Sequence, residues 1–271
     1  MNLFDVENKV ILITGGGGVL GGSMAEYLLK NEAIIVILDY RDDIVNSAVE
    51  RLKKISGKVS GFVCNALDEK SLQQVSDKII GQYKKIDVLI NAAGGNMPGA
   101  TIGVEQTIFD VNIEHFKKVV DLNLFGSILP SLVFGKEMVK QKKGVVINIS
   151  SMTAQSAITR VVGYSASKAA IDNYTKWLAV ELAQKFGEGL RVNAIAPGFF
   201  IGNQNRDLLI NKETGSYTER GDTIIRNTPM NRFGEADELN GSIHYLCSEA
   251  SKFVTGTVLP IDGGFSAFSG V

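Results

Sequence analysis

The 271-residue sequence predicts an α/β fold, built as a single doubly wound parallel sheet with helices on both faces. Short β-branched runs alternate with amphipathic stretches of helical period along the whole chain. Such alternation implies right-handed crossovers, which place helices on both sides of parallel strands. The runs expected to be strands are Val10–Ile13, Ile34–Leu38, Val59–Val63, Val88–Ile90, Val145–Ile149, Arg191–Ile195 and Thr257–Ile261.

Composition narrows the kinds of partner. Nothing marks a boundary, so we expect one domain over residues 1–271. The 28 Lys and Arg residues balance 29 Asp and Glu residues, which favours a small-molecule partner and no nucleic acid. The first residues lack a signal-peptide pattern, and no apolar run reaches the roughly 18 residues of a membrane span, so a cytoplasmic protein is expected, with no membrane partner. The two cysteines and two histidines show no metal-ligand spacing, so no metal is expected.

A glycine-rich turn, Thr14–Gly21, follows the first expected strand. Glycines permit a tight turn and let backbone N–H groups approach a pyrophosphate at the start of the next helix, as in Rossmann-like sheets. The turn therefore predicts a dinucleotide cofactor. The contacts expected there are Gly15, Gly17, Gly18, Leu20 and Gly21.

The second expected strand is followed by Asp39. Its carboxylate can accept hydrogen bonds from an adenosine ribose and would repel a 2′-phosphate, so it predicts NAD rather than NADP. Arg41, two residues later, keeps NADP open.

Tyr164 and Lys168 lie four residues apart in a helical stretch, so their side chains project from one face. A nearby ammonium stabilises a phenolate and lowers the pKa of the tyrosine, which makes it a proton donor and acceptor. Ser151 precedes Tyr164 by thirteen residues, just after an expected strand. Together they predict hydride transfer between a nicotinamide and a carbonyl or alcohol. The polar segment 202–228, with weak helical signals, is expected to form a substrate lid.

Taken jointly, these motifs resemble the short-chain dehydrogenases/reductases over nearly the whole chain. The resemblance rests also on Asn91-Ala92-Ala93-Gly94, Asn123 and Pro197-Gly198. It implies a catalytic tetrad in which Asn123 holds a relay water, Ser151 holds the substrate oxygen, Tyr164 is the acid or base and Lys168 its charged neighbour. It implies a homotetramer, in which the helix that carries Tyr164 and the preceding long helix form an interface. Trp177 lies on that helix, and either core packing or a subunit contact is expected for it. The further cofactor contacts it implies are Asn65, Ala66, Asn91, Ala92 and Gly94, with Asn91 and Gly94 on the adenosine side, and Pro197, Gly198 and Phe200 on the nicotinamide side, besides Tyr164 and Lys168.

Three segments resemble, within this family, the subgroup of D-mannonate oxidoreductases, or fructuronate reductases: Asn91–Asn96, Pro197–Arg206 and Val258–Val271. Such a substrate is a polyhydroxylated carboxylate, which amides and guanidinium groups can bind. The predicted substrate contacts are Asn96, Ser151, Arg160, Gln204, Asn205 and Arg206. For Arg160 and for Arg206, a surface salt bridge is the alternative role.

Two other functions stay open at this point. The first is a related polyol or sugar-acid dehydrogenase, such as a gluconate 5-dehydrogenase, which would share all the motifs. The second is a regulator that senses dinucleotides without turnover. The four filled tetrad positions disfavour that second function.

Overall fold

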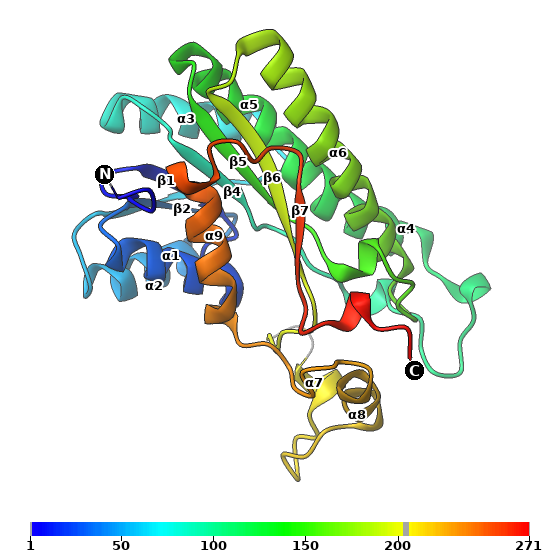
Figure 1. The fold of residues 1–271 in the computed structure, drawn as a ribbon. Coiled ribbons are helices and arrows are strands. Elements are labelled where there is room, and N and C mark those ends of the chain that lie inside the picture. Colours follow the sequence, from blue (N-terminus) through cyan, green and yellow to red (C-terminus); the bar gives the residue numbers. More distant parts are fainter. Residues whose placement is uncertain (1, 203–205, 271) are drawn as a thin grey trace.

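A computed structural model describes residues 2–202 and 206–270 of the chain. It confirms the predicted fold class. Seven strands form one parallel sheet in the order β3-β2-β1-β4-β5-β6-β7 (Figure 1). The strands are β1 Val10–Thr14, β2 Ile34–Asp39, β3 Val59–Val63, β4 Val88–Asn91, β5 Gly144–Ile149, β6 Leu190–Pro197 and β7 Val258–Ile261.

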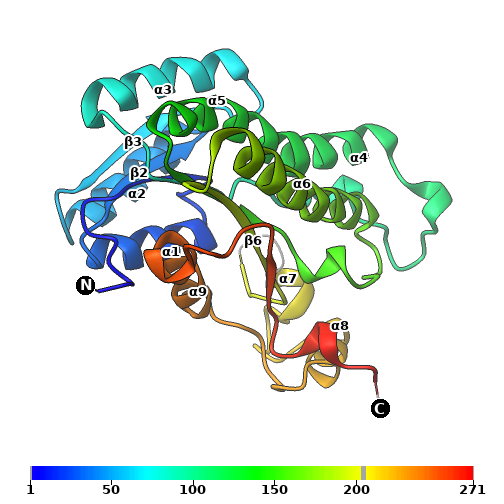
Figure 2. The ribbon, with the colours of Figure 1, turned by 45° about the horizontal axis from the view of Figure 1, so that its top comes forward.

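Helices cover both faces of the sheet, as Figure 2 shows. One face packs against α1, α2 and α9, and the other against α3, α5 and α6. The helices are α1 Val19–Lys30, α2 Asp42–Lys53, α3 Glu69–Tyr83, α4 Ile113–Val120, α5 Gly126–Gln141, α6 Val162–Phe186, α7 Arg206–Leu209, α8 Glu219–Arg226 and α9 Asn240–Cys247.

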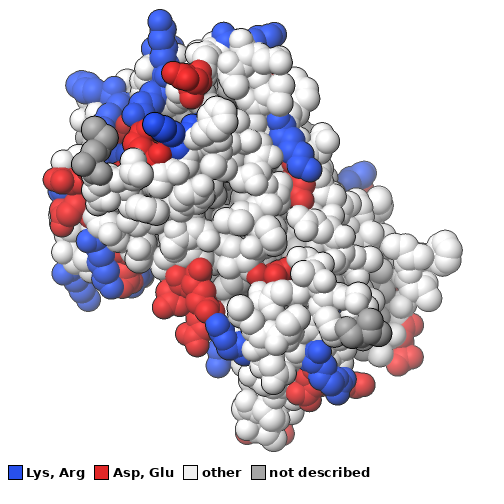
Figure 3. Space-filling view, in the orientation of Figure 1, with Lys and Arg blue, Asp and Glu red and all other residues white. Residues whose placement is uncertain are grey.

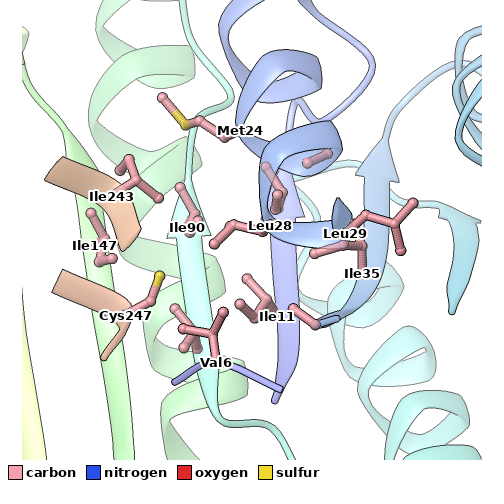
Figure 4. Packing of buried hydrophobic residues seen from close by; sticks show 14 of the residues in the cluster. Val6, Ile11, Met24, Leu28, Leu29, Ile35, Ile90, Ile147, Ile243 and Cys247 are labelled. Carbon is pink, nitrogen blue, oxygen red and sulfur yellow. The ribbon is translucent and has the colours of Figure 1, made fainter. Parts of the chain in front are cut away.

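The alternation of side chains along β1 explains the two layers. Ile11 and Ile13 belong to the cluster that contains α1 and α9, whereas Val10 and Leu12 belong to the cluster under α3, α5 and α6. Figure 4 shows Ile11 beneath Leu28 of α1. Each fully buried aliphatic side chain stabilises the fold by about 1.5–3 kcal/mol. Residues Val10–Ile13 of this strand are therefore apolar without interruption, because both faces of the strand are buried.

The order of strands reverses at β1, which pairs with β2 on one side and β4 on the other. In the register, Thr14 lies opposite Leu38 and Asn91, so the residues that follow these three strands share one edge of the sheet. A doubly wound sheet binds its ligand in the crevice outside such an edge. The fold thus gathers the glycine-rich turn and Asp39 at one crevice.

The predicted lid segment folds as a small unit at the same end of the sheet (Figure 1). Helices α7 and α8 enclose a cluster of their own, formed by Leu209, Ile224, Ile225 and Phe233, which is separate from the two main cores. A bridge between Phe200 and Gly234 closes the unit. The packed unit therefore extends to Gly234, and a substrate lid over about 202–228 stays a prediction.

The surface gives no single charged field on the face drawn in Figure 3, where acidic and basic side chains are interspersed around a largely uncharged centre. One helical stretch, Ile113–Gln141, is long and apolar enough to cross a membrane, and half of its most apolar window is buried inside the protein. Core helices of soluble proteins meet the same criterion. Among residues 2–202 and 206–270, no three His, Cys, Asp or Glu side chains are grouped so as to hold a metal.

Candidate active site

The glycine-rich turn forms a cradle at the end of β1. Gly15 has a φ of +65°, and a Cβ there would lie 2.9 Å from the Ala92 carbonyl oxygen. A Cβ on Gly21 would lie 2.6 Å from the Gly15 oxygen, so both positions need glycine. The Thr14 hydroxyl accepts the Ala92 N–H at 3.1 Å and ties this turn to the end of β4. Gly18 begins α1 with no side-chain cap, which suits an anion at the helix N-terminus.

The end of β2 presents Asp39 beside this cradle. Its carboxylate accepts the Tyr40 N–H at 2.9 Å, and the Gly17 N–H points to it as well. Burial raises the pKa of Asp39, and these N–H groups offset part of that rise. A Cβ on Gly17 would overlap the side chain of Ile44, so this glycine is required by packing. Leu20 packs against the main core from α1 and holds the turn in place.

Asn65 and Ala66 follow β3, at the part of the crevice where the adenosine is expected. The Cys64 N–H donates to the Asp39 carbonyl at 2.7 Å, so the chain just before Asn65 lies beside the end of β2. The Asn65 side-chain oxygen accepts the Leu67 N–H at 3.0 Å and closes a turn. Ala66 is half-buried beside it. The two residues thus lie at the predicted edge, next to Asp39.

Asn91 has a different environment from the one expected. Its side-chain NH2 donates to Ser131 and to Asn148, each at 2.8 Å, inside the layer between the sheet and α5. Only its backbone faces the crevice edge, so a direct side-chain contact with adenosine is not supported. Gly94, also expected on the adenosine side, lies instead against the tetrad: a Cβ there would be 2.8 Å from the Asn123 oxygen and 3.4 Å from the Lys168 ammonium.

Asn123 lies in a π-helical turn, Asp121–Phe125, that joins α4 to α5. A π turn leaves backbone carbonyls without their usual helical partner, and π turns occur frequently at functional sites. The Asn123 amide donates to the Val119 carbonyl at 2.8 Å and to the Gly95 carbonyl at 2.7 Å. Its oxygen accepts the Gly95 N–H at 3.0 Å. Asn123 therefore clamps the loop after β4 against the helix.

Ser151, Tyr164 and Lys168 converge above the end of β5. Ser151 caps a short 3-10 turn, and its hydroxyl is hydrogen-bonded to Tyr164. The Lys168 ammonium lies 5.4 Å from the centre of the Tyr164 ring and donates to the Ile149 carbonyl at 2.7 Å. The structure thus brings together the three residues that the sequence spaced thirteen and four positions apart. Asn123 lies next to this group, because Gly94 packs against both the Asn123 side-chain oxygen and the Lys168 ammonium.

Comparison with known proteins identifies the family. The family model described as enoyl-(acyl carrier protein) reductase matches residues 18–266. An oxidoreductase from Bacillus subtilis, UxuB, whose activity is uncharacterized, is 43% identical over 98% of both chains. The chain belongs to the short-chain dehydrogenase/reductase family. The 2-dehydro-3-deoxy-D-gluconate 5-dehydrogenase of Formosa agariphila is 33% identical over 100% of this chain and 97% of its own. A crystal structure of a candidate D-mannonate oxidoreductase from Haemophilus influenzae, with bound NAD, has a TM-score of 0.92 and 42% identity over 98% of both chains.

In this short-chain dehydrogenase/reductase, burial is the main influence on the pKa values of Tyr164 and Lys168. Burial raises the pKa of Tyr164, and the hydrogen bond from Ser151 offsets only part of the rise. Burial also lowers the pKa of Lys168 to about 8. The Tyr164 pKa is therefore raised rather than lowered as expected, and the group that opposes the effect of burial is Ser151 rather than Lys168. A protonated Tyr164 is the form that donates a proton to a carbonyl oxygen.

Asp172 is a member of the site that the sequence reasoning missed. It lies four residues after Lys168 on α6, its carboxylate accepts the Ser150 hydroxyl, and it raises the pKa of Lys168 against the effect of burial. The Ser150 hydroxyl also contacts the Lys168 carbonyl at 3.4 Å. The signal was available, because positions four apart in a helix share a face. Ser150 thus links the Lys168 backbone to this carboxylate.

The end of the crevice where the nicotinamide is expected is formed by β6 and β7. The Gly198 N–H donates to the Ile261 carbonyl at 2.9 Å, and a Cβ on Gly198 would lie 2.6 Å from Asp262. Pro197 ends β6 beside this contact. Phe200 is buried and packs on Gly234, where it lines a cavity of about 370 Å³ beyond β7. Its side chain therefore supports the lid segment rather than facing the tetrad, whose four residues do not line that cavity.

The predicted substrate residues fall into two groups. Asn96 donates to the Thr101 hydroxyl at 2.8 Å, and its buried oxygen has no partner among the described residues. Arg160 lies two residues before α6, and its Nε donates to the Ile102 carbonyl at 2.7 Å. Arg206 is exposed at the start of α7. Gln204 and Asn205 lie outside the residues that the structure describes.

Proposed function

We propose that this enzyme transfers hydride between NAD(H) and a sugar acid, and that it interconverts D-fructuronate and D-mannonate. The observation that supports this choice of substrate is the similarity of the chain to the candidate D-mannonate oxidoreductase, at 42% identity over 98% of both chains. The unpartnered oxygen of Asn96 and the guanidinium of Arg160 supply groups for hydroxyls and a carboxylate.

The proposed cofactor is NAD, which that relative holds in its crystal structure. Three features of this chain fit a dinucleotide: the glycine cradle from Gly15 to Gly21, the uncapped start of α1 and the carboxylate of Asp39. A carboxylate there disfavours the 2′-phosphate of NADP. We expect the enzyme to use NADH better than NADPH. Asp39→Ala should reduce this preference for NADH over NADPH, because it weakens the binding of NADH.

The bound cofactor supplies or accepts the hydride. During reduction, Tyr164 gives its phenolic proton to the substrate oxygen, which the Ser151 hydroxyl holds beside it. The charged form of Lys168 stabilises the phenolate that remains. During oxidation the same phenolate removes the alcohol proton.

The decisive experiment is a panel of hexuronates and aldonates, followed by the absorbance of NADH. Reduction of fructuronate, or oxidation of mannonate, at a higher kcat/KM than the other compounds supports the proposal. Turnover of another compound with no activity on either would reject the substrate and leave the oxidoreductase chemistry in place.

A second candidate substrate is 2-dehydro-3-deoxy-D-gluconate or its 5-oxo product. The relative of that name is 33% identical over 100% of this chain. It would also present a carboxylate and hydroxyls, so the same panel includes it. A higher kcat/KM on this pair than on fructuronate and mannonate selects this candidate.

We also propose that the enzyme is a cytoplasmic homotetramer. Helices α5 and α6 expose large apolar side chains on their outer faces, where a subunit contact would cover them. These side chains are Leu132, Trp177 and Val180, which are 49%, 60% and 56% exposed.

A further inference from the structure

Two arginines meet where the lid segment touches the loop before α6. Arg160 belongs to that loop, and Arg220 is the second residue of α8. The Arg220 guanidinium donates to the hydroxyl and the carbonyl of Thr159, at 3.3 and 3.4 Å. Thr159 is the neighbour of Arg160 in the chain. The two cationic side chains are both half-buried and approach each other across this contact.

Arg160 is held in place by its own loop. Its Nε donates to the Ile102 carbonyl at 2.7 Å, and its carbonyl accepts the Ile102 N–H at 3.0 Å. Its φ of +76° lies in the left-handed region, which non-glycine residues rarely adopt. Strained backbone of this kind clusters at functional sites. The two terminal nitrogens of the guanidinium make no hydrogen bond within the described part of the chain, so they are free to bind a ligand.

No carboxylate compensates this pair. Arg41, Arg51 and Arg232 each form an ion pair at 2.5–2.8 Å, whereas neither Arg160 nor Arg220 has a carboxylate within 4.0 Å among residues 2–202 and 206–270. Burial lowers the pKa of Arg220, and the charge of Arg160 lowers it further. Two half-buried cations that repel each other bind an anion well, because one carboxylate can accept from both guanidinium groups.

We propose that Arg160 and Arg220 together bind the carboxylate of the sugar acid. The inference rests on the proposed function and specifies the groups that recognise this substrate class. Arg160 lies in the loop that leads into α6, the helix of Tyr164, and in this proposal the carbon chain of the substrate extends from the bound acid group toward the phenol. The exposed Arg206 is then not the carboxylate contact. Since Arg220 belongs to α8, the bound carboxylate would also fasten the lid segment to the core.

The test compares Arg220→Gln with Arg226→Gln. Arg226 lies on the same helix and is exposed, and among the described residues its guanidinium donates only to the Thr223 hydroxyl, at 3.1 Å. The kcat/KM for fructuronate with NADH should fall about ten- to a hundred-fold in Arg220→Gln, the factor that corresponds to one charge-assisted pair. Reduction of the neutral ketose fructose should change less than about three-fold, and Arg226→Gln should match wild type. Equal losses on both compounds, or equal effects of the two variants, would overturn the inference.

A binding measurement separates this inference from the proposed function. The melting temperature of each protein with NAD is measured with added mannonate and with added mannitol, its neutral counterpart. Absence of turnover of both fructuronate and mannonate by wild type would reject the proposed substrate. Stabilisation of wild type and Arg226→Gln by mannonate, but not of Arg220→Gln, would still support the arginine pair in that case. The same stabilisation in all three proteins, or none beyond that given by mannitol, rejects the pair.

Discussion

At the scale of single residues, Tyr164 is the proposed proton donor to the substrate oxygen. Tyr164→Phe removes the phenolic proton and keeps the ring, so kcat for fructuronate should fall by about 10²–10⁴-fold, the range for a general acid. The dissociation constant of NADH should stay within about three-fold, measured by fluorescence titration. Turnover within ten-fold of wild type would show that another group donates the proton.

The pair of Lys168 and Asp172 predicts the pH dependence. A lysine whose pKa is lowered to about 8 is charged below that pH and loses its charge above it. Reduction, which needs the ammonium beside the developing phenolate, should therefore decline as the pH rises through about 8. Asp172→Asn removes a carboxylate that raises the lysine pKa, so the decline should begin at a lower pH.

The measurement is kcat/KM for reduction from pH 6 to 10, with Asp43→Asn on the surface of α2 as the control. Asp43 pairs with Arg41 and is remote in the chain from the tetrad. A decline at the same pH in Asp172→Asn and wild type would show that this carboxylate does not act on Lys168.

The positions of some site residues could be predicted from the sequence, and those of others could not. Ser151, Tyr164 and Lys168 could be recognised because a helix and a strand end restrict where such side chains point. Asn91 could not be placed, because its residue type fits both a ligand contact and the buried bonds to Ser131 and Asn148. Arg220 was missed because its role depends on the packing of α8 against Thr159, which no local pattern encodes.

At the scale of elements, the π turn Asp121–Phe125 gives Asn123 a structural role in addition to the catalytic role that the family resemblance implies. Asn123→Ala leaves the buried Val119 carbonyl and the Gly95 amide without partners. At about 1–3 kcal/mol for each of these two unpaired groups, the free energy of unfolding should drop by about 2–6 kcal/mol. Urea denaturation measures the drop.

The matched control is Asn46→Ala, which removes an exposed amide bonded to Asp42 on α2 and should change stability by less than about 0.5 kcal/mol. If Asn123→Ala lost activity with unchanged stability, the clamp on Gly95 would not be structural.

Strands and long helices were predictable because β-branched runs and apolar periodicity report burial on two faces. All seven expected strands are present, with ends shifted by at most two residues. The π turn was not foreseen. Its extra residue changes the hydrogen-bond partners of the helix but leaves no distinct mark in residue types.

At the scale of the whole molecule, the apolar faces of α5 and α6 predict assembly. Wild type should sediment as a tetramer, and Trp177→Glu as a smaller species, because a charge would be buried where a large aromatic side chain now lies. Ile55→Glu, at an exposed apolar position after α2, should leave the sedimentation unchanged. A monomeric wild type would contradict the proposed subunit contact.

The separate core of the lid segment has a consequence for how such an enzyme diversifies. Leu209, Ile224, Ile225 and Phe233 pack among themselves, so the segment can accept mutations with little effect on the packing under the sheet. Proton transfer depends on α6 and β5, while one of the two proposed acid-binding arginines lies on α8. Grafting this segment between relatives should therefore exchange substrate preference while the chemical step is inherited unchanged.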